Sequence, residues 1–350
     1  MRAAVFLGPR RIEVADRPDP HVTAPTDAVV RVALGCVCGS DLWYYRAESP
    51  HAVGPIGHEF VGVVEQVGAE VRSIAEGDFV IAPFKFSDGT CAHCRAGWTS
   101  NCVAGAPFGT DGIDGGQGEA VRVPLADGTL VRVPGSGHSD ETMRSLLTLS
   151  DVMATGHHAA VSAGVKPGSV VAVVGDGAVG LCAVIAARRL RAARIIALSR
   201  HTPRQALARS FGATDIVAGR GDEAAAAVLE LTDGIGVDAA IECVGTAESF
   251  ATAFAVARPG STVGFVGVPH SVEVPIDTMF GRNIGLRGGS APVRRYIPEL
   301  LDDVLAGRIH PDRVFDFETD LDGIGDAYAA MDERRAIKSL IRMGKKEKRP

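Results

Sequence analysis

The sequence lacks a long apolar run, an excess of basic charge and a disordered composition. No stretch reaches the roughly 18 apolar residues that cross a bilayer, so we expect no membrane association. The 350 residues carry 36 Lys and Arg against 42 Asp and Glu, a balance that argues against a broad basic surface for nucleic acid. With 46% hydrophobic and 22% charged residues, the chain can bury a large core. Its length predicts two domains.

Cysteine is scarce, and the seven cysteines are an odd number, with five of them in two local clusters. The apolar run at residues 3–7 is short and is interpreted as a first strand, not as a signal peptide. We therefore expect a reducing, cytoplasmic setting. Clustered cysteines in that setting bind metal more often than they form disulfides.

The chain changes character near residue 150. Residues 1–150 carry short apolar or alternating runs between Gly, Pro and Asp turns, typical of a mostly-β domain. A helix is expected over 151–163, and beyond it strands and helices alternate, which indicates a doubly wound parallel sheet. Strands are expected over residues 169–174, 194–198, 215–217, 237–243 and 262–266, and helices over 178–190, 203–211, 223–231 and 247–257. The last 60 residues are too few for a further domain, so we expect them to return to the first one.

The segment Gly175-Asp176-Gly177-Ala178-Val179-Gly180 places Gly-x-Gly-x-x-Gly between an expected strand and an Ala-rich expected helix. Gly175 permits a tight turn, Gly177 lets the backbone approach a pyrophosphate, and Gly180 allows close helix packing. The first N–H groups of the helix that begins at Ala178 and Val179 would face the phosphates. A dinucleotide site is predicted here.

The end of the second strand of this region lacks a carboxylate. An NAD site places Asp or Glu there to bind the ribose hydroxyls, whereas this chain has Ser199 followed by Arg200, with Arg204 further on. A serine hydroxyl and guanidinium groups attract a 2′-phosphate. The sequence therefore favours NADP over NAD, with solvent-exposed helix-start charges as the plainer interpretation of Arg204.

Two clusters of metal-ligand residue types lie in the first region. Cys38 and the pair His58 and Glu59 supply a thiolate, an imidazole and a carboxylate, which suit Zn²⁺, and Asp151 is a candidate for a distant third ligand. The second cluster has the spacing C-x2-C-x7-C, which predicts a closed structural zinc. Its cysteines are Cys91, Cys94 and Cys102, and its fourth ligand is Asp88, His93 or another group.

With these motifs in this order, the sequence resembles the zinc-dependent medium-chain alcohol dehydrogenase family over essentially its whole length. The stretch Gly57-His58-Glu59-x2-Gly62-x5-Gly68-x2-Val71 matches the family's zinc signature. The resemblance implies an α/β fold in which a doubly wound (Rossmann) dinucleotide-binding domain, residues 155–288, is inserted in a mostly-β, distorted-barrel catalytic domain. That catalytic domain would comprise residues 1–154 and 289–350, with the active site in the cleft between the two.

The resemblance also implies a role for each matching residue. Cys38, His58 and Asp151 match the catalytic zinc ligands, with the aspartate typical of NADP-linked bacterial members. Glu59 matches a carboxylate behind the zinc, Asp41 a group that orients the histidine, and Ser40 the hydroxyl that takes the alcohol proton. Lys338 matches a basic residue that reaches the cofactor pyrophosphate.

Two positions depart from the family pattern. The structural zinc of the family usually has four cysteines, and here Asp88 stands in the first place, so a site of three thiolates and one carboxylate is expected. Many members also place a histidine at the solvent end of the proton relay, where this chain has Trp43. Trp43, Tyr44, Phe84 and Phe108 are expected pocket walls, suited to a hydrophobic substrate.

We therefore predict an NADP-dependent alcohol dehydrogenase or carbonyl reductase with two zinc ions per chain, forming a homodimer or homotetramer and binding neither nucleic acid nor membrane. Conjugate reduction of a double bond on the same fold is one alternative. A non-enzymatic nucleotide-binding structural protein is another, and intact zinc ligands argue against both.

Overall fold

The computed structural model describes residues 1–110 and 112–343, and its internal contacts divide the chain into two compact units. The first contains Met1–Asp151 and the C-terminal part from Pro292, and the second is Val152–Ala291. The two divisions thus follow residues 151 and 291, whereas the sequence interpretation placed them after 154 and 288.

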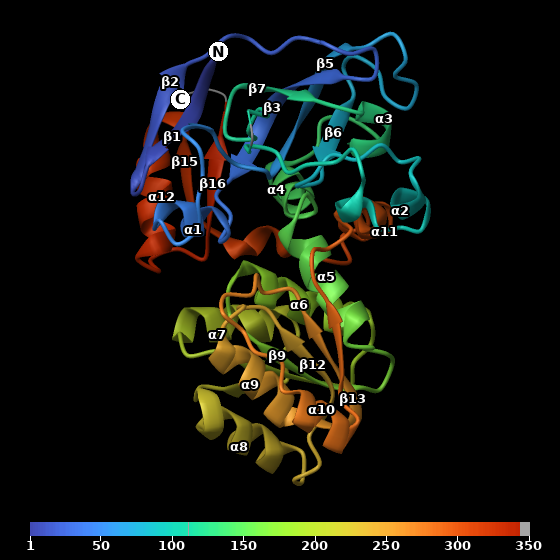
Figure 1. The fold of residues 1–350 in the computed structure, drawn as a ribbon, viewed down its shortest axis with the longest axis vertical. Coiled ribbons are helices and arrows are strands. Elements are labelled where there is room, and N and C mark those ends of the chain that lie inside the picture. The colour runs from blue at the N-terminus through green and yellow to red at the C-terminus, as the bar shows by residue number, and fades with distance from the viewer. Residues whose placement is uncertain (111, 344–350) are drawn as a thin grey trace. The chain divides into compact units, whose positions relative to one another are not determined.

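The first unit is built on two sheets (Figure 1). A small antiparallel sheet has the order β2-β1-β4, and a seven-stranded sheet has the order β15-β16-β3-β5-β6-β8, with β7 paired to β3. The strands are β1 (Arg2–Gly8), β2 (Arg11–Asp16), β3 (Ala28–Cys36), β4 (Gly54–Pro55), β5 (Phe60–Val67), β6 (Phe79–Ala82), β7 (Ala120–Val123), β8 (Val131–Arg132), β15 (Phe315–Asp320) and β16 (Lys338–Arg342). Since Leu340 of β16 pairs with Cys36 of β3, the C-terminal segment returns to the first unit as predicted.

The helices of the first unit range from four residues in α2 and α3 to thirteen in α11. They are α1 (Asp41–Tyr45), α2 (Ala92–Arg95), α3 (Ala126–Thr129), α4 (Asp140–Thr148), α11 (Val293–Leu305) and α12 (Ile324–Asp332), with 3₁₀ turns at Thr99–Asn101, Pro311–Val314 and Leu321–Gly323. Helix α4 lies in the region interpreted as mostly β. Its signal is a start motif: the Ser139 hydroxyl accepts from the Thr142 N–H, and Asp140 and Glu141 fill the first turn.

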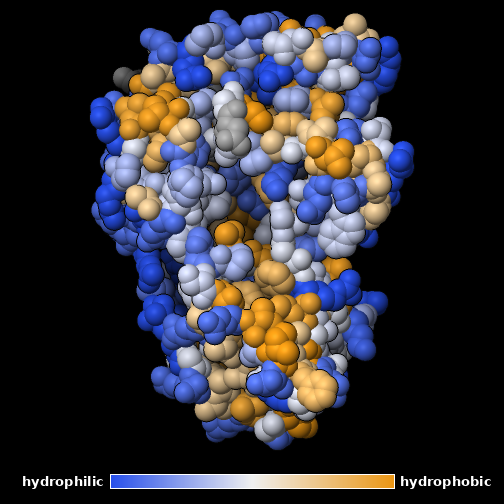
Figure 2. Space-filling view, in the orientation of Figure 1, coloured by the Kyte–Doolittle hydropathy of each residue, from blue (hydrophilic) through white to orange (hydrophobic). Residues whose placement is uncertain are grey.

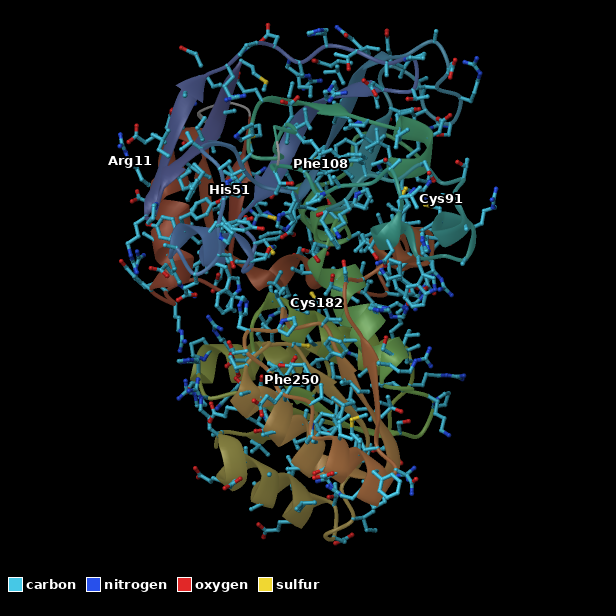
Figure 3. All side chains as sticks on the ribbon, in the orientation of Figure 1. Arg11, His51, Cys91, Phe108, Cys182 and Phe250 are labelled. Carbon is cyan, nitrogen blue, oxygen red and sulfur yellow. The ribbon has the colours of Figure 1, made fainter. Side chains whose placement is uncertain are left out.

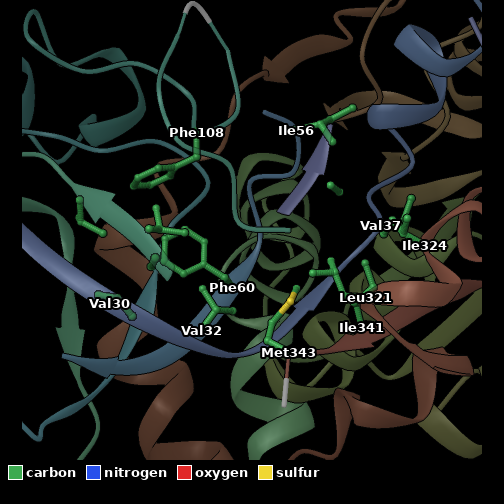
Figure 4. Packing of buried hydrophobic residues seen from close by; sticks show 14 of the residues in the cluster. Val30, Val32, Val37, Ile56, Phe60, Phe108, Leu321, Ile324, Ile341 and Met343 are labelled. Carbon is green, nitrogen blue, oxygen red and sulfur yellow. The ribbon is translucent and has the colours of Figure 1, made fainter. Parts of the chain in front are cut away.

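One face of β3 and β5 packs into the core of this unit (Figure 4). Phe60 and Phe108 meet edge to face with ring centroids 5.1 Å apart, and Phe86 packs on Phe108 from 5.8 Å. Because Phe108 is only 1% exposed, it belongs to this core. The expectation that Phe108 forms a pocket wall is therefore wrong.

The second unit contains a six-stranded sheet in the order β11-β10-β9-β12-β13-β14, with every pair parallel. Its strands are β9 (Val170–Val174), β10 (Arg194–Leu198), β11 (Asp215–Val217), β12 (Val237–Glu242), β13 (Ala257–Phe265) and β14 (Gly285–Gly288). Its helices are α5 (Val152–Ser162), α6 (Ala178–Arg189), α7 (Thr202–Phe211), α8 (Gly221–Leu231), α9 (Ala247–Val256) and α10 (Ile276–Arg282). This is the doubly wound order, which reverses direction beside β9, where such sheets bind ligands.

Helices α5, α6 and α7 pack in sequence, as do α8 and α9 (Figure 1). Cys182 on α6 and Phe250 on α9 are both buried in the unit's interior (Figure 3). Among residues 1–110 and 112–343, no helix combines the length and the apolar character that crossing a membrane requires.

Candidate metal centres and nucleotide loop

Three predicted ligands converge in the first unit. Cys38 follows the end of β3, His58 precedes β5, and Asp151 precedes α5. The Asp151 Oδ2 lies 3.6 Å from the Cys38 Sγ and 3.5 Å from the His58 Nε2. Residues 113 positions apart in the chain are thus brought to one point.

These separations fit a zinc ion. With Zn–S near 2.3 Å and Zn–N or Zn–O near 2.0 Å, tetrahedral geometry puts sulfur and oxygen ligands about 3.5 Å apart and nitrogen and oxygen ligands about 3.3 Å apart. The donor set of one thiol, one imidazole and one carboxylate is also that of a zinc site with an open position. The three residues therefore fit the catalytic zinc that the sequence predicts.

Asp41 lies beside the histidine of this cluster. Its Oδ1 lies 3.3 Å from the His58 Nδ1, while its Oδ2 accepts the Cys38 N–H at 3.0 Å. A proton held on Nδ1 leaves the Nε2 lone pair directed at the cluster. Asp41 thus occupies the place expected for the orienting carboxylate.

Two residues that the sequence interpretation missed complete this arrangement. The Gln117 Nε2 donates to the Cys36 carbonyl at 3.0 Å and lies 3.3 Å from the Asp41 Oδ2. The Tyr328 hydroxyl donates to the Gln117 Oε1 at 3.0 Å. The glycines around Gln117 at 115, 116 and 118 were the one available signal, since they mark a backbone in close contact with its surroundings.

Glu59 is buried beside the cluster in an ion pair with Lys338. The Lys338 Nζ lies 2.7 Å from the Glu59 Oε1 and also donates to the Val37 carbonyl, and the Cys36 thiol donates to the other Glu59 oxygen at 3.3 Å. The side chains of Glu59 and Lys338 are 0% and 1% exposed. Contact between Lys338 and a cofactor pyrophosphate stays a prediction, because in this structure its ammonium group binds Glu59.

The cluster carries a negative potential. Burial raises the pKa of the Cys38 thiol, and the carboxylates of Glu59 and Asp151 raise it further. Burial lowers the pKa of His58, yet Asp41 and Cys38 outweigh that effect and hold it well above its ordinary value. A site that favours protons in this way also favours a divalent cation in their place.

Ser40 and the aromatic residues lie near these ligands in the chain. Ser40 precedes α1 and its hydroxyl does not cap the helix, while the Trp43 N–H bonds the Ser40 carbonyl. The Phe84 ring lies edge-on to His58 with centroids 6.2 Å apart. Tyr44 instead packs on His51, with ring centroids 4.7 Å apart.

The second cluster is formed by Asp88, Cys91, Cys94 and Cys102, whose ligand atoms lie within 4.8 Å of one another. The sulfurs of Cys91 and Cys102 are 4.0 Å apart, close to the roughly 3.8 Å of two thiolates on one tetrahedral zinc. Cys91 is labelled in Figure 3, and His93, on α2, is exposed and is not part of the cluster. None of the seven cysteines, each of which lies within the described residues, is part of a disulfide bond.

Hydrogen bonds from the backbone favour the ionised form of Asp88, which is the form that binds a metal. Its Oδ1 accepts the N–H groups of Thr90 at 2.7 Å and Cys91 at 2.9 Å. The Cys91 N–H is the main reason why the pKa of Asp88 falls below its usual range. Burial raises the pKa of Cys94 to about 12, so a metal bound in this loop must displace the proton of that thiol.

The glycine loop joins β9 to α6 in the second unit. Gly175 has φ of +117°, and a Cβ on Gly180 would lie 2.0 Å from the Gly175 carbonyl oxygen. Both positions therefore require glycine, and α6 begins at Ala178 with Val179 in its first turn. The N-terminus of α6 thus lies at the carboxyl edge of the sheet, where a pyrophosphate binds in doubly wound folds.

Ser199, which directly follows β10, lies beside an acidic group that the sequence interpretation did not weigh. The Ser199 hydroxyl donates to the Asp176 Oδ2 at 2.9 Å, and the Arg204 Nη1 lies 3.3 Å from the Asp176 Oδ1. Arg200 is exposed. The structure thus brings Arg204 to Ser199, and Asp176 was missed because its motif is usually read for the glycines alone.

Comparison with known proteins agrees with this architecture. The family model for zinc-binding dehydrogenases matches residues 178–306, and the model for the GroES-like domain of alcohol dehydrogenases matches residues 24–135. Zinc-type alcohol dehydrogenase B of Aspergillus flavus is 38% identical over 312 residues, which are 86% of this chain and 72% of that protein. The chain belongs to the zinc-dependent medium-chain alcohol dehydrogenase family.

Solved structures of alcohol dehydrogenases share the whole fold. Alcohol dehydrogenase TADH from Thermus sp. ATN1 superposes with a TM-score of 0.90 at 33% identity, covering 98% of this chain and 99% of that one. A Sinorhizobium meliloti 1021 protein described as a zinc-binding dehydrogenase, bound to NADP, superposes with a TM-score of 0.82 at 28% identity over 98% and 99% of the two chains. The protein is therefore a zinc-dependent oxidoreductase of the alcohol dehydrogenase type.

Proposed function

We propose that this dehydrogenase transfers hydride between NADP(H) and an alcohol or its aldehyde or ketone. The observation that carries the proposal is the convergence of Cys38, His58 and Asp151 at zinc-ligand separations. A bound zinc supplies Lewis acidity to the substrate oxygen, and the nicotinamide supplies or accepts the hydride. Phe84 beside His58 would give the substrate an apolar contact.

The protein's own groups hold this chemistry in place. Asp41 keeps the His58 proton on Nδ1, Gln117 supports Asp41, and the Glu59–Lys338 pair places a buried carboxylate behind the ligands. Ser40, whose hydroxyl is not used as a helix cap, takes the proton of the alcohol. Conjugate reduction and a purely structural role are not favoured, because the full ligand set is present.

The preference for NADP is proposed from Ser199, Arg200 and Arg204, and the NADP-bound S. meliloti relative supports it.

The function is tested with a panel of alcohols and carbonyl compounds, in which turnover is monitored by the absorbance of NADPH. For the best substrate, kcat/KM with NADPH should exceed that with NADH. Absence of turnover over the whole panel by zinc-loaded protein would refute the proposed activity, and equal or higher values with NADH would refute the preference.

Two zinc ions per chain are proposed, one at each cluster. Protein purified without added metal should contain close to two equivalents by elemental analysis. Asp88→Ala should lose the structural zinc and destabilise the fold more than it lowers kcat, because a closed site contributes to folding rather than to chemistry. A content near one that Asp88→Ala leaves unchanged would show that the loop binds no zinc.

The chain is also proposed to act as a cytoplasmic homo-oligomer. Seven cysteines, none of them in a disulfide bond within the described part of the chain, fit a reducing compartment. In the described part of the chain β14 pairs on one side only, and α10, which precedes it, exposes Ile276 and Phe280. Apolar side chains gather on the surface around α9 and α10 (Figure 2). A second copy would cover such a surface.

A further inference from the structure

The selectivity of the nucleotide site for NADP over NAD, which presupposes the proposed function, depends on the groups that meet at the end of β10. The chain has no carboxylate at the end of β10, but the glycine loop after β9 brings one to the same place. Asp176, from the glycine loop, accepts the Ser199 hydroxyl at 2.9 Å on Oδ2 and lies 3.3 Å from the Arg204 Nη1 on Oδ1. Arg204 reaches the Asp176 carbonyl oxygen at the same distance.

Register explains why these groups meet. Leu198 of β10 pairs with Val174 of β9, so the two strands end side by side. Ser199 directly follows β10, and Gly175 and Asp176 directly follow β9. Arg204 comes from the first turn of α7. Three elements therefore deliver one hydroxyl, one carboxylate and one guanidinium to the carboxyl edge of the sheet.

Ser199, Asp176 and Arg204 are fixed by hydrogen bonds, and two of them are still partly accessible to solvent. The Gln205 Nε2 donates to the Ser199 carbonyl at 2.7 Å, and Ser199 is 2% exposed. Asp176 and Arg204 are partly exposed, with side-chain values of 20% and 15%. A carboxylate has about four lone-pair positions, so Asp176 can accept a further hydroxyl while it keeps its present partners.

The two charged groups act oppositely on the two cofactors. A carboxylate accepts the hydroxyls of the adenosine ribose and repels a 2′-phosphate, whereas a guanidinium attracts the phosphate. Since Arg204 is already paired with Asp176, part of its attraction for a phosphate is offset. Serine and arginine alone would select NADP strongly, but with Asp176 between them the selection is weakened.

We propose that Asp176 is a specificity-determining residue that lets this dehydrogenase bind NAD as well as NADP. The ratio of the two affinities is set by the balance between Asp176 and Arg204. NADP⁺ binds more tightly, by less than about tenfold. Removing the carboxylate charge makes the site a strict NADP site.

The test is isothermal titration calorimetry of the full-length, zinc-loaded protein with NADP⁺ and with NAD⁺, without substrate. Asp176→Asn keeps an oxygen for the Ser199 hydroxyl and removes only the charge. It should tighten NADP⁺ binding roughly fivefold to tenfold and weaken NAD⁺ binding by a similar factor, the scale of one unit charge a few ångströms away in water. Asp222→Asn makes the same charge change at an exposed site on α8 and should leave both affinities unchanged.

Arg204→Gln provides an independent arm should Asp176→Asn fold poorly. It should weaken NADP⁺ at least tenfold while NAD⁺ changes less than about threefold. A wild-type protein that binds NADP⁺ more than about tenfold tighter than NAD⁺, or an affinity ratio unmoved by Asp176→Asn, overturns this inference and leaves the proposed function intact. A wild-type protein that binds neither dinucleotide overturns both.

Discussion

Each of two candidate zinc ligands has a glycine beside it, and the two glycines differ in what they require. Gly57, before His58, has φ of +90°, and a Cβ there would lie 2.5 Å from the Gln117 Cγ. Gly39, after Cys38, has open space around the same position. Only the first glycine is dictated by the packing that holds Asp41 and His58 in place.

Gly57→Ala should therefore destabilise the protein by about 2–4 kcal/mol, because it adds backbone strain to a clash with Gln117. Gly39→Ala is the matched control and should stay within about 1 kcal/mol of wild type. Chemical denaturation of both zinc-loaded variants measures the difference. Equal stabilities would show that Gln117 moves aside without cost.

The buried pair of Glu59 and Lys338 supports a second prediction. Lys338→Met leaves the Glu59 carboxylate buried without its cation and should cost about 3–5 kcal/mol. The double variant Lys338→Met with Glu59→Gln removes both charges and should recover most of that loss. A double-mutant cycle of unfolding free energies tests this. Additive losses would mean that the two groups stabilise the fold independently.

Ser40 and Trp43 supply a third prediction, on proton transfer. Ser40→Ala should lower kcat for alcohol oxidation by about 10²-fold or more, because no other hydroxyl is assigned to the proton. Trp43→His should add a dependence of kcat near the imidazole pKa of about 6.5. The test is to measure kcat over a series of pH values for the wild type and both variants, after the zinc content of each has been verified. Full activity of Ser40→Ala across the series would mean that the proton leaves directly to solvent.

At the scale of elements, the parallel sheet could be predicted from the sequence because its strands are buried apolar runs between Ala-rich helices. The ranges 194–198 and 215–217 match β10 and β11. Helix α4 was missed although Ser139 marks its start. The reason is that the short apolar runs around it led to a mostly-β interpretation of the whole region. The candidate ligands Cys38 and His58 could be identified from local motifs, and the structure brings them together. Gln117, Tyr328 and Asp176 could not, since their roles depend on contacts across the fold.

The pair between β10 and β11 carries a prediction on pH. Arg194 binds Asp215 through two hydrogen bonds of 2.8 Å and lowers the pKa of Asp215 to about 2 from 3.8. A lowered pKa in the folded state gives stability that is present above about pH 3.8 and is lost as the pH falls through about 2.

Asp215→Asn should therefore cost about 1 kcal/mol at pH 7, a value reduced from the pKa shift because the pair is partly exposed. The difference from wild type should stay constant down to about pH 4.5 and shrink below it. Urea unfolding at a series of pH values measures it, with Asp222→Asn as the exposed control. A constant difference down to the acid limit of the fold would exclude the ion pair as its cause.

At the scale of the whole molecule, the surface proposed for assembly lies on the second unit. A parallel sheet edge exposes unpaired backbone groups that proteins usually cover. β14 lies at that edge, and α10 leads into it with Phe280 87% exposed and Ile276 63% exposed. An aromatic side chain so exposed is typical of a surface that another chain covers.

Phe280→Asp should therefore convert the proposed oligomer to a smaller species, because a buried carboxylate without a partner opposes association. Sedimentation velocity at micromolar concentration should show a lower mass than wild type, with the zinc content unchanged. Val103→Asp is the control, since it makes the same kind of change at a residue of the first unit that is 74% exposed. If Val103→Asp dissociates the oligomer and Phe280→Asp does not, the contact lies on the first unit. A wild-type protein that sediments as a monomer would refute the proposed oligomer.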